Sequence, residues 1–427
     1  MYLAPRGTTD ILPEDQPYWL YLYDKIRHVV GLFDYQRIDV PVFEETALYV
    51  RSVGEGTDIV DKEMYNFVDK GGRDIALRPE FTAGIVRAYL ENGMRTLPQP
   101  VKLYTTGPLF RYERVQAGRY RQHTQFDIES IGSLDPAVDL EIMSVAWQLY
   151  SELGFQGLAF QLNSTGCPVC RPAYIQRLVA YYEPRHQEAC EDCLRRLQRN
   201  PLRVLDCKVE TCQPIIAEAP HIIDHLCPEC AEHFATLRGY LDALGRPYTL
   251  NHRLVRGLDY YTKTVFEVWA EGIGAQNAIC GGGRYDGLAE ELGGPPTPGI
   301  GFGSGMERII LLMKENGIAV PGVPAPQVAM IYHGSNAKTR CVQLITDLRE
   351  QDIRAVMAFD DRSMRAQLRN ANRVGATYAI ILGEDELAAG NAVLQDMLTD
   401  APRETVAQTE IVHLLAERFE SDYPCKL

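Results

Sequence analysis

The sequence has no apolar run that approaches the roughly 20 residues a membrane-spanning helix needs. Its richest apolar stretch, Tyr378–Leu382, has the length of a strand. The N-terminal residues also lack a basic segment followed by an apolar segment, which is the pattern of a secretory signal. We therefore expect a cytoplasmic protein that makes no use of a membrane.

An excess of positive charge is also missing, because 43 Lys and Arg stand against 57 Asp and Glu, giving a net charge of −14. Proteins that coat nucleic acid without specificity are basic overall, so this class is disfavoured. Specific binding of nucleic acid through local basic patches stays open. No internal repeat or low-complexity segment interrupts the chain.

Cysteine is scarce outside one segment: eight of the 11 cysteines lie between Cys167 and Cys230. Without an export signal we expect a reducing compartment, where metal binding is favoured over disulfides. The eight form four close pairs; the first two pairs are separated by 19 residues and the last two by 14. Four thiolates suit a structural zinc site, and the alternative is a set of reduced, partly buried thiols. The candidate ligands are Cys167, Cys170, Cys190, Cys193, Cys207, Cys212, Cys227 and Cys230.

A chain of 427 residues predicts two or three domains. Apolar spacing predicts a helix over residues 15–33, followed by a strand-like run, Arg37–Phe43, which Pro41 interrupts or confines to an edge. Short strands continue to residue 131 without regular alternation with helices, which favours an antiparallel sheet. We expect residues 1–165 and 246–320 to form one core, interrupted by a helical, cysteine-rich insertion over residues 166–245.

A Pro- and Gly-rich hinge, Val320–Pro326, marks a linker before a last domain over residues 326–427. Strands and helices alternate there, which predicts a small α/β domain with parallel strands. The expected strands are Val328–Tyr332, Arg354–Ala358 and Tyr378–Leu382, and the expected helices are Lys338–Glu350 and Ser363–Val374.

Two kinds of motif could carry chemistry. Residues 111–121 hold four arginines and a single acid, Glu113. Guanidinium groups suit bidentate contacts with phosphates, although a solvated hairpin is the alternative. Residues 280–287 contain three consecutive glycines, and small residues alternate over residues 299–305. Such runs let a backbone approach a ligand or another backbone closely, and no Lys-Ser/Thr pair follows to make a P-loop.

The order of these motifs resembles the histidyl-tRNA synthetases, which are class II aminoacyl-tRNA synthetases. The similar segments are residues 6–10, 77–83, 111–122, 254–261, 280–287 and 305–308. The resemblance covers nearly the whole chain, including a C-terminal α/β anticodon-binding domain. It implies an α+β catalytic core with an antiparallel sheet, a homodimer, and a ligase that uses ATP with Mg²⁺ to activate histidine and then charges tRNA(His).

The resemblance also implies roles for single residues. Arg111 and Arg256 would flank the α-phosphate and the substrate carboxylate, while Glu113, Arg119 and Arg308 would hold the rest of ATP. Adjacent residues on a regular strand face opposite ways, so Tyr260 and Tyr261 share a pocket only if the strand bends there. Without the surrounding motifs, Glu80 could be a helix-capping partner and the tyrosines core aromatics. The residues implied in histidine binding are Glu80, Phe81, Thr82, Arg111, Gln125, Glu129, Arg256, Tyr260 and Tyr261.

For tRNA, the resemblance points to Gln116, and arginine spacing points to one face of the expected helix 363–374. That face would carry Arg362, Arg365, Arg369 and Arg373, which could meet phosphates or only water. The cysteine-rich insertion carries a similar set, Arg195, Arg196, Arg199 and Arg203, with the same two interpretations. The chain departs from the family pattern at Val115, His123 and Thr124, which leaves open the shape of the loop between the arginines.

Two other classes share parts of this pattern. The regulatory subunit of ATP phosphoribosyltransferase is a histidine-sensing relative that is expected to lack both the anticodon-binding domain and intact signature motifs, and this chain keeps them. A regulatory module of a sensor kinase would need a kinase domain, for which 427 residues leave no room.

Overall fold

The computed structural model describes residues 2–54, 57, 59–115, 118–271, 278–360 and 362–420. The chain divides into two compact units, Met1–Pro321 and Gly322–Leu427. Each unit is described by itself. Within the described residues, no helix combines the length and the apolar character that crossing a membrane requires.

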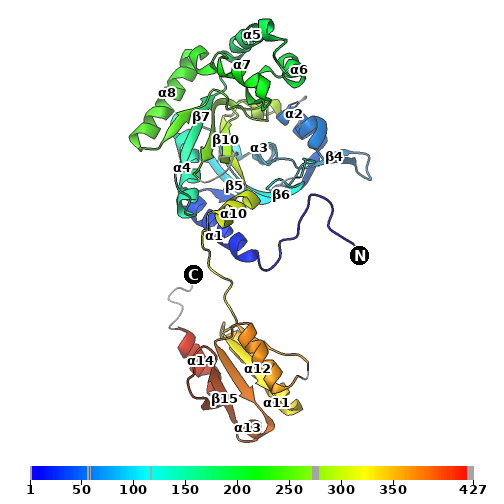
Figure 1. The fold of residues 1–427 in the computed structure, drawn as a ribbon, viewed down its shortest axis with the longest axis vertical. Helices are drawn as coiled ribbons and strands as arrows, with labels where there is room; N and C mark the ends of the chain where they lie inside the picture. Colours follow the sequence, from blue (N-terminus) through cyan, green and yellow to red (C-terminus); the bar gives the residue numbers. More distant parts are fainter. Residues whose placement is uncertain are drawn as a thin grey trace. The chain divides into compact units, whose positions relative to one another are not determined.

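An eight-stranded sheet organises the first unit, in the order β1-β5-β6-β11-β10-β9-β7-β8 (Figure 1). The six inner strands pair antiparallel, and only the outermost pairs, β1 with β5 and β7 with β8, are parallel. The expected antiparallel core is therefore confirmed. The strands are β1 (Gln36–Arg37), β5 (Val101–Phe110), β6 (Gln122–Ile131), β7 (Ala159–Ser164), β8 (Tyr248–Leu250), β9 (Thr262–Trp269), β10 (Ala278–Arg284) and β11 (Gly299–Gly305).

Helices cover both faces of this sheet. On one face α1 (Gln16–Leu32), α4 (Pro136–Glu152) and α10 (Met306–Glu315) share an apolar core with Phe126 and Ile128 of β6. The buried side of α1 has the helical spacing expected from the sequence. The other face packs against α3 (Thr82–Glu91) and α9 (Leu288–Glu291). Because neighbouring residues of a strand point to opposite faces, the residues of β6 between the core positions point toward the α3 side.

The run Arg37–Phe43 is not one strand, as its composition had suggested. It splits into β1 and β2 (Phe43–Glu45), and β2 joins β3 (Asn66–Val68) and β4 (Asp74–Leu77) in a separate three-stranded sheet. Pro41 has no N–H to donate, and its carbonyl and that of Val40 accept hydrogen bonds from Arg78 Nη1 at 3.3 and 2.7 Å. The following helix is α2 (Thr46–Val53).

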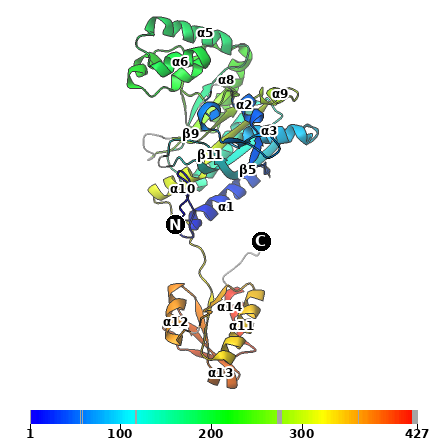
Figure 2. The same ribbon diagram turned by 90° about the vertical axis from the view of Figure 1, so that its right-hand side faces the viewer.

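The cysteine-rich segment is helical and connects β7 with β8. Its helices are α5 (Arg171–Tyr182), α6 (Glu191–Arg199), α7 (Gln213–Ala217) and α8 (Pro228–Ala243). Since β7 and β8 pair in parallel, the whole segment is a crossover connection of the kind parallel strands need. Figures 1 and 2 show α5 and α6 gathered at one end of the first unit, with α8 running back toward the sheet.

The second unit is an α/β domain, as expected, but its sheet is mixed. The strand order is β13-β12-β14-β15-β16; the first three strands are parallel, and β15 and β16 are antiparallel additions that the sequence analysis missed. The strands are β12 (Val328–Tyr332), β13 (Ala355–Met357), β14 (Tyr378–Leu382), β15 (Asn391–Asp396) and β16 (Glu404–Ala407). The helices are α11 (Ser335–Glu350), α12 (Met364–Arg373), α13 (Glu384–Ala388) and α14 (Ile411–Glu420).

Candidate active site

A cavity of about 160 Å³ opens on the α3 side of the central sheet. It brings together seven of the residues implied in histidine binding, from segments far apart in the sequence. It also contains Asp127 and Tyr285, which the sequence analysis did not single out. The polar side chains that line it are Glu80, Thr82, Arg111, Gln125, Asp127, Arg256, Tyr260, Tyr261 and Tyr285.

Two buried carboxyl groups lie on one side of this cavity. Glu80 Oε1 accepts a hydrogen bond from the backbone N–H of Ala83 at 3.0 Å, so it does cap α3, but Oε2 is buried without a partner in the described structure. Asp127 Oδ2 accepts from Gln125 Nε2 at 3.0 Å, and Oδ1 is likewise buried and unpartnered among the described residues. Burial raises the pKa of Glu80 and raises the pKa of Asp127 to about 8. Such oxygens are suited to receive a cationic group.

Glu129 lies beside the cavity and not in its lining. One carboxylate oxygen accepts from Thr82 Oγ1 at 2.7 Å, and the other accepts from the Tyr285 hydroxyl at 2.6 Å. Burial raises the pKa of Glu129 well above its usual range. Glu129 therefore orients two hydroxyl groups that do line the cavity.

Tyr260 and Tyr261 both line the cavity, with ring centroids 4.8 Å apart. The bend that this requires is present, because β9 begins only at Thr262 and Lys263 adopts a left-handed φ of 48°. Phe81 differs from its neighbours: its ring is fully buried under the Arg78 guanidinium, 4.6 Å from the ring centroid. The Phe81 side chain therefore has a packing position and is not among the residues that line the cavity.

Arg256 explains one glycine of the run in β10, Gly281. Its Nη1 donates to Glu267 Oε1 at 3.1 Å, and the guanidinium crosses directly over Gly281, where any Cβ would overlap it. In the neighbouring strand β11, a Cβ at Gly301 would overlap the carboxylate of Glu129. The glycines thus make room for polar side chains to approach the sheet, and a P-loop-like turn is not formed.

The residues implied in ATP binding begin with Arg111 at the histidine cavity and continue through Glu113 to Arg119. Arg111 lines the cavity and donates from Nε to the carbonyl of Pro79 at 2.7 Å. Glu113 lies between Arg111 and Arg119, with N···O distances of 3.9 and 3.7 Å. Arg308, in the first turn of α10, donates to the carbonyl of Ala278 at 2.9 Å. Burial lowers the pKa of Arg308, and repulsion from Arg119 lowers it further.

Three positions that depart from the family pattern have defined surroundings. The backbone N–H of Thr124 donates to Glu307 Oε1 at 2.7 Å, which joins β6 to the start of α10. Burial, with repulsion from Arg111, lowers the pKa of His123 to about 3, so this ring is neutral at physiological pH. Val115 lies against Gly7 of the N-terminal segment. Gln116 lies outside the described residues.

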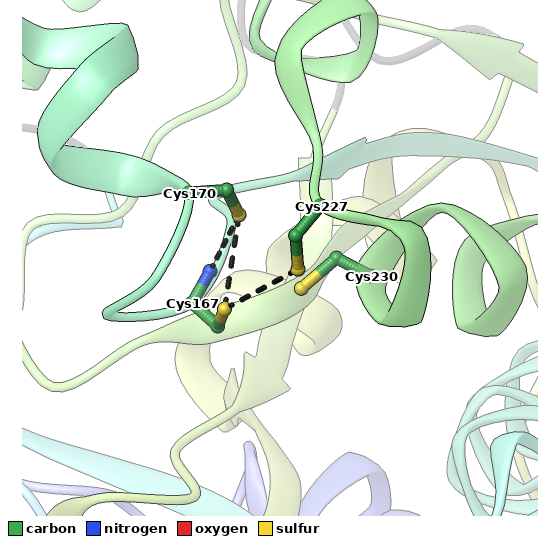
Figure 3. A group of neighbouring side chains, drawn as sticks. All are labelled: Cys167, Cys170, Cys227 and Cys230. Carbon is green, nitrogen blue, oxygen red and sulfur yellow. Dashed lines mark hydrogen bonds between the residues drawn. The ribbon is translucent and has the colours of Figure 1, made fainter.

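The eight cysteines form two four-residue clusters, but not by pairing in sequence order. Cys167 and Cys170 meet Cys227 and Cys230 (Figure 3). The inner pairs, Cys190 with Cys193 and Cys207 with Cys212, form the second cluster. The spacing argument had matched the first pair with the second, and the third with the fourth. That matching is wrong because the chain reverses inside the insertion, so its outer pairs meet at its base.

Both clusters have the dimensions of a four-thiolate metal site. The Sγ–Sγ distances are 3.7 Å from Cys167 to Cys170 and to Cys227, and 3.8 Å from Cys190 to Cys207. A tetrahedral zinc with Zn–S bonds of about 2.3 Å separates its sulfurs by about 3.8 Å, whereas a disulfide requires about 2.05 Å. The ten cysteines among the described residues are free of disulfides.

The two arginine sets have different surroundings. Arg195, Arg196, Arg199 and Arg203 line a hollow of about 310 Å³ beside Lys62. Arg199 and Arg203 also line a second hollow of about 220 Å³, whose lining includes Arg256 and Tyr261 and therefore shares these residues with the histidine cavity. On the second unit, Arg365, Arg369 and Arg373 are exposed on α12, whereas Arg362 precedes this helix and pairs with Asp360 at 3.1 Å.

Comparison with known proteins agrees with this geometry over the whole chain. The family profile described as "Histidyl-tRNA synthetase" matches residues 7–309. The chain belongs to the histidyl-tRNA synthetase family. A second profile, "Anticodon binding domain", matches residues 327–418, which corresponds to the second unit.

Relatives of this family match along nearly their full length. Histidine–tRNA ligase from Dehalococcoides mccartyi is 52% identical, over 96% of this chain and 98% of that protein. The enzyme of the same name from Desulforamulus reducens is 50% identical, over 97% of this chain and 99% of that protein. The crystal structure of apo histidyl-tRNA synthetase from S. aureus has a TM-score of 0.82 and 37% identity, and covers 97% of this chain and 100% of that one.

Proposed function

We propose that the protein activates L-histidine with ATP, releasing pyrophosphate, and transfers the histidine from histidyl-adenylate to the 3′ end of tRNA(His). The observation that carries this proposal is the cavity itself, in which unpartnered buried carboxylate oxygens and two arginines face the same small space. A free amino acid has the complementary charges, an ammonium and a carboxylate, on one carbon. Its volume also suits the size of the cavity.

Each end of the substrate has a matching group. The ammonium would bind Glu80 and Asp127, because each offers a buried oxygen that has no other partner in the described structure. The carboxylate would lie between Arg111 and Arg256. The imidazole would meet the hydroxyl of Tyr261, with Glu129 acting through Thr82 and Tyr285 to fix the neighbouring hydroxyls. A substrate without the ring nitrogens would leave these buried groups unpaired, which is a strong basis for specificity.

Adenylate formation then needs positioning more than proton transfer. The histidine carboxylate is already ionised and attacks the α-phosphate in line, while pyrophosphate leaves. Negative charge grows on the equatorial oxygens of the phosphate, and Arg111 and Arg256 would stabilise it. Glu113, Arg119 and Arg308 would hold the nucleotide and its distal phosphates, with Mg²⁺ accompanying ATP.

In the second step the terminal ribose hydroxyl of tRNA attacks the activated carbonyl, and AMP leaves. The hollow that Arg199, Arg203 and Arg256 line would receive the phosphates of the tRNA end beside the cavity. Arg365, Arg369 and Arg373 on α12 would contact the anticodon stem, with Arg362 beside them. Gln116 stays a proposed contact at the acceptor end.

The proposal extends to the organisation of the chain. Residues 1–165 and 246–320 form the catalytic core, residues 166–245 an inserted module that contains structural zinc, and residues 326–427 the anticodon-binding domain. The tetrahedral spacing of the thiols supports zinc, and the absence of disulfides among the described cysteines supports a cytoplasmic location. We also expect a homodimer; a monomer in analytical ultracentrifugation at micromolar concentration would contradict this part.

The decisive experiment is histidine-dependent exchange of pyrophosphate into ATP with the purified protein. Exchange that needs histidine and is not supported by other amino acids is the expected result. A protein that binds histidine without catalysing exchange would instead be a histidine sensor, like the regulatory subunit of ATP phosphoribosyltransferase.

A further inference from the structure

The first cysteine cluster lies at the base of the inserted helices and not within them. Cys167 and Cys170 follow directly after β7, and Cys170 precedes the first residue of α5. Cys227 and Cys230 lie at the beginning of α8, the helix that leads back to the core. Figure 3 shows the two cysteine-bearing turns facing each other with their sulfurs between them. A metal at this cluster would therefore join the two ends of the insertion.

The first of these turns is hydrogen-bonded to Tyr261 and Lys263, at the end of the family-like segment 254–261. The backbone N–H of Thr165 donates to the carbonyl of Lys263 at 2.8 Å, and the N–H of Lys263 donates to the carbonyl of Gly166 at 2.9 Å. Arg171, next to Cys170, donates from Nε to the carbonyl of Thr165 at 2.9 Å. The same guanidinium also donates to the carbonyl of Tyr261, which is a wall of the histidine cavity.

The second turn reaches the same segment from the other side. Glu229 lies between Cys227 and Cys230, and its Oε1 accepts a hydrogen bond from Lys263 Nζ at 2.7 Å. The Lys263 side chain is only 8% exposed, and its backbone has the left-handed φ that produces the bend after Tyr261. A lysine rarely adopts this conformation without surrounding support. Both turns of the cluster therefore hold residues 261–263.

The second cluster has different neighbours. Cys193, Cys207 and Cys212 pack into the insertion's own apolar cluster, together with Tyr182 and Leu205. Beyond that cluster, the insertion makes side-chain contacts to the segment before Tyr261: Gln213 accepts a hydrogen bond from Arg253, and Asn200 Nδ2 donates to Asp259 Oδ1. These contacts involve side chains, and neither is a backbone hydrogen bond to residues 261–263. A metal here would fix the inserted helices to one another.

From these contacts we propose two zinc sites with separate tasks. The zinc held by Cys167, Cys170, Cys227 and Cys230 positions the Tyr261–Lys263 segment and thereby sets the affinity for histidine. The zinc held by Cys190, Cys193, Cys207 and Cys212 stabilises the inserted helices and leaves the histidine cavity unchanged. This inference rests on the proposed zinc binding, and it adds a positioning role in the reaction itself.

The test compares one serine substitution in each cluster, Cys170→Ser and Cys193→Ser, in the full-length protein. Elemental analysis should give two zinc ions per chain for the unaltered protein and one for each variant. In pyrophosphate exchange, Cys170→Ser should raise the KM for histidine about tenfold and leave the KM for ATP within about twofold. Cys193→Ser should leave both KM values unchanged while lowering the rate of tRNA aminoacylation.

Hydrogen–deuterium exchange gives a readout independent of activity. Cys170→Ser should speed exchange in the peptide that contains residues 260–264, and Cys193→Ser should speed it only within residues 190–215. The proposal of separate tasks would be overturned if both variants changed the KM for histidine equally. It would also be overturned if Cys170→Ser lost one zinc without changing this KM. Unaltered protein without zinc would overturn the proposed metal binding as well, so the two failures are distinguishable.

A further variant covers the case in which Cys170→Ser does not fold. Glu229→Gln keeps all four thiols but weakens the charged hydrogen bond to Lys263. It should retain two zinc ions and still raise the KM for histidine, by a few-fold. An unchanged KM for histidine in this variant would contradict the connection through Lys263.

Discussion

The histidine cavity and helix α12 use polar side chains in opposite ways. In the cavity, Glu80 and Asp127 are buried, and Arg256 is fixed by Glu267 and by its contact with Gly281. On α12, Arg365 and Arg369 point into water. Interactions of buried charges are weakly screened, whereas exposed charges act through a field that salt weakens. Substitutions in the cavity should therefore change the rate of pyrophosphate exchange or the KM for histidine strongly. Substitutions on α12 should change tRNA binding weakly and in a salt-dependent way.

The largest effect is expected for Arg256→Ala. Removing one fixed donor from developing negative charge raises the activation free energy by about 3 kcal/mol, which lowers the rate of pyrophosphate exchange by a factor of 100 or more. The measurement is the exchange rate at saturating histidine and ATP. Arg27→Ala, which removes an exposed arginine paired with Asp24 on α1, is the matched control and should be neutral. Near-normal exchange in Arg256→Ala would remove Arg256 from the mechanism.

The next largest effect is expected for Asp127→Asn, which tests a residue identified only in the structure. Loss of a charged hydrogen bond to the ammonium costs about 1.5–3 kcal/mol, so the KM for histidine should rise roughly 10- to 100-fold. The KM for ATP should stay the same, because Asp127 is proposed to contact only the histidine ammonium. The control is Asp39→Asn, an exposed carboxylate beside Arg37. A uniform loss of exchange without a change in the KM for histidine would contradict ammonium binding by Asp127.

The pH dependence of histidine binding follows from the same carboxylate. The pKa of Asp127 is raised to about 8 by burial, so in the free protein this group is mostly protonated at neutral pH. The substrate ammonium favours the ionised form, and binding must then release the proton. The KM for histidine should therefore fall as pH rises from about 6.5 to about 8, and change little just above it. In Asp127→Asn this slope should flatten, and an equal slope in both proteins would assign the titration to another group.

The smallest effect is expected on α12. The double variant Arg365→Ala, Arg369→Ala should leave pyrophosphate exchange unchanged and raise the KM for tRNA(His) a few-fold at low salt. The difference from the unaltered protein should shrink as salt is added, because fewer counterions are released from the RNA. Loss of exchange activity in this variant would break the contrast between the two regions.

Where the sequence was sufficient, the signal was local. Helix α1 follows from apolar spacing, and β12 and β14 coincide with the predicted ranges because both are short, buried strands with clear flanking turns. The cavity residue Gln125 and its neighbour Glu129 came from the family resemblance. Asp127 could have been found as well, since strand alternation puts it on the same face of β6 as its two neighbours, and that alternation was not applied there.

Where the sequence was insufficient, the missing information was spatial. Spacing favoured zinc sites built from consecutive cysteine pairs, but the reversal of the chain inside the insertion brings the outermost pairs together. Pro41 marked a break correctly, yet nothing local indicated that the two halves of its strand would join different sheets. The packing of Phe81 under Arg78 depends on an arginine whose other contacts lie on distant segments.

The meeting of Cys167 and Cys170 with Cys227 and Cys230 closes residues 171–226 into a loop. For a closed loop of this kind, each doubling of length raises the entropic term by only about 0.6 kcal/mol. The segment inside this loop can be lengthened, shortened or replaced while its two ends keep their positions after β7 and at the start of α8. A foreign helical hairpin spliced between Arg171 and Leu226 should thus leave the central sheet folded, while it removes the contacts of Gln213 and Asn200 with Arg253 and Asp259.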